Sequence, residues 1–176
     1  GNYGKQTEIL NSTGGNQRGG LSFNIGHSNL NRKLKVGLSA MYTYTSVRNT
    51  MTPSVVTLAP NAPDIYNENG LLNYEPWSKA DMSLNFPFSA LEMPSSSDTH
   101  FLTSSLDVSY AILNNLSFST KFGYQKTSNA NKATTAITAQ DPSLDPKGGL
   151  FTGTNNNYNL IVEPQINYNT KLGPGQ

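Results

Sequence analysis

The sequence predicts an all-β fold in the form of an antiparallel up-and-down meander, and three observations favour it. Apolar and polar residues alternate with a period of two in several segments, as they do along a strand with two different faces. The links between these segments alternate between very short and very long. Charged residues make up only 13% of the chain, whereas it contains 9 Tyr and 7 Phe, which favour strands.

The first pair of strands is expected at 19–29 and 34–48, with residues 1–18 supplying the end of an earlier strand and a Gly/Asn-rich loop. The link at 30–33 is short and polar, as in a hairpin. A four-residue turn there keeps the apolar residues of both strands on one face. The pairs predicted by this register are Phe23 with Ala40, Ile25 with Leu38, and His27 with Val36.

The second pair is expected at 100–112 and 116–126, around a second short turn at 113–115. On the polar face Asp107 then falls opposite Lys121, which predicts a cross-strand ion pair. The pairs predicted on the apolar face are Ile112 with Leu116, Tyr110 with Phe118, and Leu106 with Phe122.

A fifth complete strand is expected at 156–169, followed by a third short turn at 171–176. Glu163 lies on the polar face of this strand. Pro164 interrupts its apolar face, and because proline has no N–H to donate to a ladder, a bulge is expected there.

Two long connections, 49–99 and 127–155, follow the first and second pairs. The first connection holds six of the 10 prolines, so it is not expected to lie inside a sheet. Short helices are compatible with 53–59 and 88–92, and an Asn-Gly pair predicts a tight turn over 66–70.

The two faces of these strands differ in a way that suits a membrane. One face is aliphatic and aromatic, and the other carries Asn, Ser, Thr, Gln and Gly with few charges. Outer-membrane β-barrels combine such faces with short periplasmic turns and long extracellular loops, so residues 1–176 are interpreted as a partial transmembrane β-barrel. Asp107, Lys121 and Glu163 are then expected to face the lumen. Aromatic girdles are expected at the outer interface (Tyr42, Tyr44, Phe122, Tyr124, Tyr158) and the inner one (Tyr110, Phe118, Tyr168).

Several classes of function receive no support from the composition. The net charge of +1 gives no footprint for nucleic acid, and the chain has no Cys for disulfides, thiol nucleophiles or Cys-based metal sites. No catalytic, cofactor-binding or metal-binding pattern stands out, and His27 and His100 are expected at the interface and not in a catalytic triad.

Two alternatives remain to the membrane interpretation. A soluble all-β carbohydrate-binding or adhesin module must bury its apolar face against a second sheet. A hydrolase on a β scaffold would need clustered carboxylates, whereas the 11 acidic residues lie mostly scattered through the loops.

Three stretches resemble the barrel of SusC/RagA-type TonB-dependent outer-membrane receptors: Tyr3–Leu10, Leu58–Gly70 and Val162–Tyr168. Their order and spacing also match, over essentially the whole chain but only a fraction of such a receptor. The resemblance implies a barrel of about 22 strands in the bacterial outer membrane that imports oligosaccharides or peptides and is not an enzyme. It also implies a plug domain, a SusD/RagB-like surface lipoprotein and the TonB energy-coupling complex as partners, with no cofactor.

Three aromatic residues of the first long loop, Tyr66, Tyr74 and Trp77, are the candidate substrate-binding residues. Exposed rings can stack on sugars or on peptide side chains, and in a nutrient receptor this loop lies on the extracellular side. The alternative is that the rings pack the loop onto itself. Because the chain has unpaired edges and an apolar face, it is expected to aggregate in water without detergent.

Overall fold

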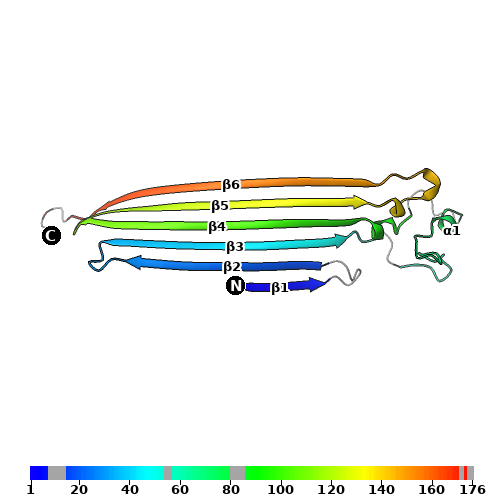
Figure 1. The fold of residues 1–176 in the computed structure, drawn as a ribbon, viewed down its shortest axis with the longest axis horizontal. Coiled ribbons are helices and arrows are strands. Elements are labelled where there is room, and N and C mark those ends of the chain that lie inside the picture. Colours follow the sequence, from blue (N-terminus) through cyan, green and yellow to red (C-terminus); the bar gives the residue numbers. More distant parts are fainter. Residues whose placement is uncertain (8–14, 54–56, 80–85, 171–172, 174–176) are drawn as a thin grey trace.

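The computed structural model describes residues 1–7, 15–53, 57–79, 86–170 and 173. These residues form one long sheet in which each strand is antiparallel to its neighbours in the chain (Figure 1). The strands are β1 (Asn2–Thr7), β2 (Gly15–Ser28), β3 (Leu34–Thr50), β4 (Pro94–Leu113), β5 (Leu116–Thr135) and β6 (Gly149–Tyr168). The all-β antiparallel meander is therefore confirmed, and within the described residues the sheet is open, with β1 and β6 as its edges.

The registers of the two hairpins follow the apolar alternation. A slip of one residue would turn every apolar side chain to the opposite face, which is why the pattern specifies the pairing strongly. The confirmed pairs are Phe23–Ala40, Ile25–Leu38 and His27–Val36 between β2 and β3, and Tyr110–Phe118, Leu106–Phe122 and Asp107–Lys121 between β4 and β5.

Local hydrogen bonds close the turn between β2 and β3. Asn29 donates its N–H to the Leu34 carbonyl at 3.1 Å, and its side-chain Oδ1 accepts the Leu34 N–H at 3.0 Å. Arg32 donates its N–H to the Asn29 carbonyl at 2.9 Å and itself adopts a φ of 56°. An Asn side chain that mimics a backbone acceptor is a common way to stabilise such a link.

The strands extend further toward the long connections than their apolar alternation predicts. The prediction that 15–18, 49–50, 94–99, 127–135 and 149–155 are loop is wrong, because these residues belong to β2, β3, β4, β5 and β6. Polar side chains support the extension: Asn129 donates from Nδ2 to Ser97 Oγ at 2.9 Å and to Thr99 Oγ1 at 2.7 Å. Cross-strand hydrogen bonds of this kind stabilise a sheet without apolar residues.

Two predictions about local irregularity are also wrong. Ile112 does not pair with Leu116, because the register shifts after Ala111 and Leu113 takes that place. β6 has no bulge at Pro164, which pairs in register with Thr120. Asn169 donates its N–H to the Asn115 carbonyl, on the side of β5. Residues of β6 an odd number of positions away from Asn169, such as Pro164, therefore direct their backbone nitrogen toward the open edge. No ladder bond is therefore lost there.

The long connections gather at one end of the sheet and the short turns at the other (Figure 1). The first connection contains α1 (Tyr74–Lys79) and the 3₁₀ helix η1 (Ser89–Glu92), and the second contains η2 (Ile137–Ala139) and η3 (Pro142–Leu144). The helix compatible with 88–92 is confirmed as η1, whereas the described residues of 53–59 are not helical.

The tight turn over 66–70 is confirmed. Gly70, with a φ of +74°, donates its N–H to the Asn67 carbonyl at 2.9 Å, while Asn67 Oδ1 accepts the N–H of Asn69 and of Leu71. Glycine adopts a left-handed φ without the steric cost of a Cβ, which explains its place in this turn. The third short turn, expected at 171–176, lies outside the described residues apart from Gly173.

Candidate functional site

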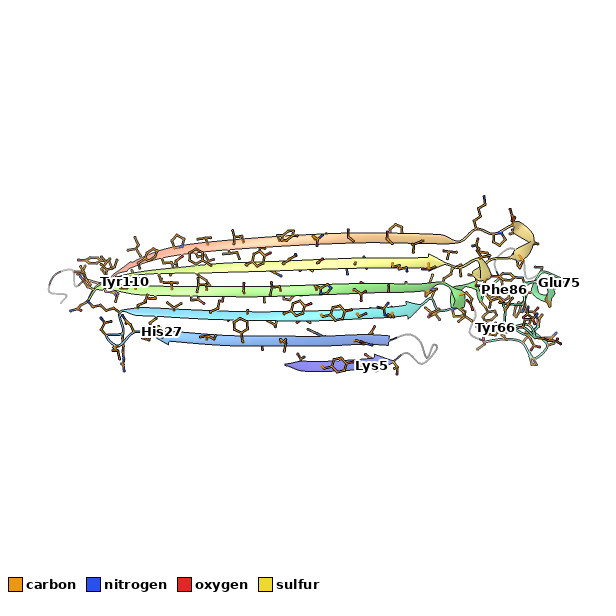
Figure 2. All side chains as sticks on the ribbon, viewed as in Figure 1. Lys5, His27, Tyr66, Glu75, Phe86 and Tyr110 are labelled. Carbon is orange, nitrogen blue, oxygen red and sulfur yellow. The ribbon has the colours of Figure 1, made fainter. Side chains whose placement is uncertain are left out.

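One face of the sheet is made apolar by five successive rows of paired residues, which we call the apolar band. Its innermost row contains Leu34, Tyr110, Phe118 and Ile166, and its outermost row contains Leu21, Tyr42, Leu102 and Tyr158. No described element lies over the sheet (Figure 2). The side chains of Ile25, Leu160 and Ile166 are 60%, 71% and 73% exposed. A continuous apolar surface of this kind is rare on proteins surrounded only by water, so the band indicates contact with another apolar medium or partner.

The aromatic residues of the outer girdle are spread over several rows of this face. Tyr42 and Tyr158 lie in the outermost row of the apolar band, Tyr44 one row beyond it and Tyr124 one row within it. Phe122 lies in the middle row, paired with Leu106 and Val162, so its assignment to the outer girdle is wrong. Lys126 shares the outermost row, and its Nζ lies 5.3 Å from the centroid of the Tyr158 ring.

A polar cluster follows directly beyond the apolar band. Tyr42 Oη and His100 Nδ1 are 2.7 Å apart, and the ring centroids of Tyr44 and His100 are separated by 5.0 Å. Tyr44 donates its hydroxyl to Asp98 Oδ1 at 3.0 Å, and Arg48 lies 3.9 Å from the same carboxylate. His100 thus contacts two tyrosines at the edge of the apolar band, and neither contact is with a serine nucleophile.

The opposite face of the sheet carries the three residues predicted to face a lumen. Asp107, Lys121 and Glu163 lie in one row across β4, β5 and β6, so the structure brings them together. Lys121 Nζ is 4.0 Å from Asp107 Oδ1, and both side chains are more than half exposed. Gly26 and Gly37 continue the row, and the face is hollowed there into a depression of about 660 Å³. This row can offer both signs of charge to whatever occupies the space in front of it.

The first long connection has a small aromatic core of its own, which we call the loop cluster. It consists of Leu72, Tyr74, Trp77 and Phe88, all buried, with Phe86 packed against them. The Tyr74 and Phe86 ring centroids are 4.4 Å apart, and Trp77 meets Phe88 edge-on at 5.4 Å. Trp77 also donates its indole N–H to the Asp64 carbonyl at 3.1 Å. A turn of helix therefore forms at α1 because its aromatic side has a partner.

The three candidate substrate-binding residues differ in how far their side chains are exposed. Trp77 is 3% exposed and Tyr74 is 8% exposed, so the expectation that these rings offer open stacking surfaces is wrong. They pack the loop onto itself. Tyr66 is 44% exposed and remains available for contact, and its labelled position lies among the loops at the end of the sheet (Figure 2).

A polar cleft lies between α1 and η3, and the sequence analysis did not identify it. It has a volume of about 620 Å³ and its lining includes Asn67, Tyr74, Glu75 and Asp141. The Lys79 ammonium, 2.6 Å from Glu75 Oε1, lowers the pKa of that carboxyl. Burial raises the pKa of the Tyr74 hydroxyl above its ordinary value. Asp141 comes from the second connection, so no local sequence pattern could have placed it opposite α1.

Two searches of the described residues gave negative results. No group of three or more His, Asp or Glu side chains among them is arranged to hold a metal ion. No helix among them is long and apolar enough to cross a membrane.

Comparisons with known proteins add no family to this picture. No protein-family model matches the chain, and no curated protein sequence matches it significantly.

Proposed function

We propose that this chain forms part of the wall of a transmembrane β-barrel in the bacterial outer membrane, with the apolar band facing lipid. The observation that carries the proposal is the uncovered apolar band on one face of a meander whose opposite face is polar. A sheet with these two faces needs lipid on one side and water on the other. The two unpaired edges of the described sheet would be closed by further strands.

The dimensions of the apolar band support this proposal. From Leu34 to Tyr42, the innermost and outermost rows of the band in β3, there are eight residue steps, which span about 26 Å at ~3.3 Å per residue. Strands of outer-membrane barrels tilt by roughly 40°, which reduces this length to a height of about 20 Å. The next row, which contains Tyr44, brings the height to about 25 Å, that of the apolar bands of such barrels.

The placement of charge along the same face supports it as well. Within the apolar band the strands carry one charged side chain, Lys126, and it lies in the outermost row. Asp98, Arg48 and Lys132 all lie beyond the band, toward the long connections. A charge at the midplane of a bilayer costs roughly 2–4 kcal/mol and one near the interface much less, so this distribution suits a membrane.

The resemblance to SusC/RagA-type receptors suggests the wider role: a TonB-dependent importer of oligosaccharides or peptides. In such a receptor the short turns face the periplasm and the loop cluster faces the cell surface. A SusD/RagB-like lipoprotein would act at that surface, and the TonB complex would act through parts of the receptor outside this chain. Asp107, Lys121 and Glu163 would line the lumen, and Tyr66 would be the accessible aromatic residue near incoming substrate.

In the soluble-module alternative, protein and not lipid covers the apolar band. Two substitutions at adjacent positions distinguish this alternative from the membrane proposal. Leu38 and Ser39 are neighbours at one height of β3 but point to opposite faces. In a Trp77→Phe background, Leu38→Trp and Ser39→Trp each provide a single fluorescent probe. In bilayers whose acyl chains carry bromine, we expect strong quenching of Leu38→Trp and little quenching of Ser39→Trp. Equal, weak quenching at both positions would refute the proposal and favour a module whose apolar face is covered by protein.

A further inference from the structure

A small basic cavity lies beyond the apolar band, on the same face of the sheet. Its volume is about 220 Å³, and the side chains that line it include Arg48 from β3, Ser96 from β4, and Lys132 and Thr134 from β5. Arg48, Ser96 and Lys132 form one row, so Ser96 lies between the two cations. With strands about 4.8 Å apart, the Cα atoms of Arg48 and Lys132 are separated by roughly 10 Å.

The chemistry of this cavity suits a phosphate group. A guanidinium offers a planar pair of donors, an ammonium adds a second positive charge, and hydroxyls supply neutral donors. No carboxylate belongs to the cavity lining. Asp98 lies on the same face, two residues along β4 from Ser96, and its contact with Arg48 at 3.9 Å holds the guanidinium beside the row.

The height of the cavity selects the kind of phosphate. Arg48 lies four residues beyond Tyr44, which is about 13 Å along the strand and about 10 Å in height at the usual tilt. The headgroup layer of a bilayer adds only about 5–7 Å on each side of the hydrocarbon core. A phospholipid phosphate therefore lies about 3–5 Å below the row, and a phosphate that the sugars of a glycolipid carry above the headgroup layer fits the height of the cavity better.

We propose that Arg48, Ser96 and Lys132 form a binding site for the phosphorylated headgroup of a glycolipid in the outer leaflet. The acyl chains of that lipid would lie against the apolar band below. This inference rests on the proposed function, because the site can meet a lipid headgroup only if the apolar band faces lipid. It adds a specific lipid partner to the wall, at the end of the sheet that carries the loop cluster.

The test uses the chain in phosphatidylcholine bilayers that contain diphosphoryl lipid A, its dephosphorylated form or phosphatidylglycerol. Lipids that remain bound after release of the chain are counted by native mass spectrometry. We expect preferential retention of diphosphoryl lipid A, reduced at least about tenfold in the double variant Arg48→Gln, Lys132→Gln, since each charge-assisted contact contributes strongly. The matched control, Arg18→Gln with Lys35→Gln, removes the same charge from the opposite face and should retain the lipid as the wild type does.

Three results would overturn this assignment: equal loss in both double variants, equal retention of the dephosphorylated lipid, or stronger retention of phosphatidylglycerol. Flotation of the chain with the vesicles separates the two proposals. If the chain floats but shows no phosphate preference, the glycolipid site is wrong and the barrel wall stands. If the chain does not associate with bilayers even when the strands that close its edges are supplied, both proposals are wrong.

Discussion

Replacing Leu106 with arginine tests directly which medium covers the apolar band. Leu106 lies in the middle row of the band, opposite Leu38, which is four residues from Leu34 and four from Tyr42. If the band spans a bilayer, the new guanidinium therefore sits near the midplane. Two control positions receive the same arginine substitution in different surroundings. Thr103 in β4 faces the polar side of the sheet, and Ser128 in β5 lies in the row beyond the band.

The expected magnitudes differ with the surrounding medium. Near the midplane, Leu106→Arg should cost roughly 2–4 kcal/mol, whereas Ser128→Arg should cost about 0–1 kcal/mol. Thr103→Arg should change stability by no more than about 0.5 kcal/mol, as expected of a substitution in contact with water. If a second protein layer covered the band, the unpaired buried charge at Leu106 would cost about 3–5 kcal/mol without the gradual dependence on depth.

Urea unfolding of the chain from phospholipid vesicles, followed by circular dichroism, measures these differences. A cost for Leu106→Arg within about 0.5 kcal/mol of zero would refute the reasoning, because it would mean that water reaches the middle of the band. An equal cost for Thr103→Arg would also refute it, since the two faces of the sheet would then not differ.

Two further predictions concern the loop cluster. Trp77→Ala removes a buried ring and should lower the local stability of the cluster by about 3–5 kcal/mol, whereas Ala at the exposed Tyr66 should cost less than about 1 kcal/mol; unchanged amide exchange of α1 in the Trp77 variant would contradict this. Because burial raises the pKa of Tyr74, its neutral hydroxyl contributes stability to the cluster that is fully present below the ordinary tyrosine pKa of about 10, and this contribution is lost as the pH rises through the folded-state value. The emission of Trp77, the only tryptophan, should report this alkaline step, and the same step at the same pH in Tyr74→Phe would show that another group causes it.

The register of the sheet was predictable because a period of two leaves few alternatives. Alternation allows Phe23 and Ile25 only every second register, and the short turn at 30–33 selects the observed pairing with Ala40 and Leu38. The same constraint put Asp107 opposite Lys121, and the 4.0 Å contact between them follows from it. These are contacts between strands joined by short turns, whose partners are close in the chain.

Other features depended on partners that no alternation pattern identifies. The extension of β4 to Pro94 relies on Asn129 reaching back to Ser97 and Thr99 from the neighbouring strand, and polar alternation alone does not reveal such bonds. Trp77 is buried because Phe86 and Phe88 return to it after α1. The tolerance of Pro164 depends on the direction of its nitrogen, which only the pairing with β5 decides.

By itself, the sequence determined that the chain is an antiparallel meander with one apolar and one polar face, because side-chain alternation and short turns are local properties. Only the tertiary structure decided where the apolar band ends, that Tyr74 and Trp77 are buried while Tyr66 is accessible, and that Arg48 and Lys132 share a cavity. Those outcomes depend on which residues meet across strands and between the two long connections. Whether a side chain is buried, and which charges lie close together, depends on these contacts and not on any one segment alone.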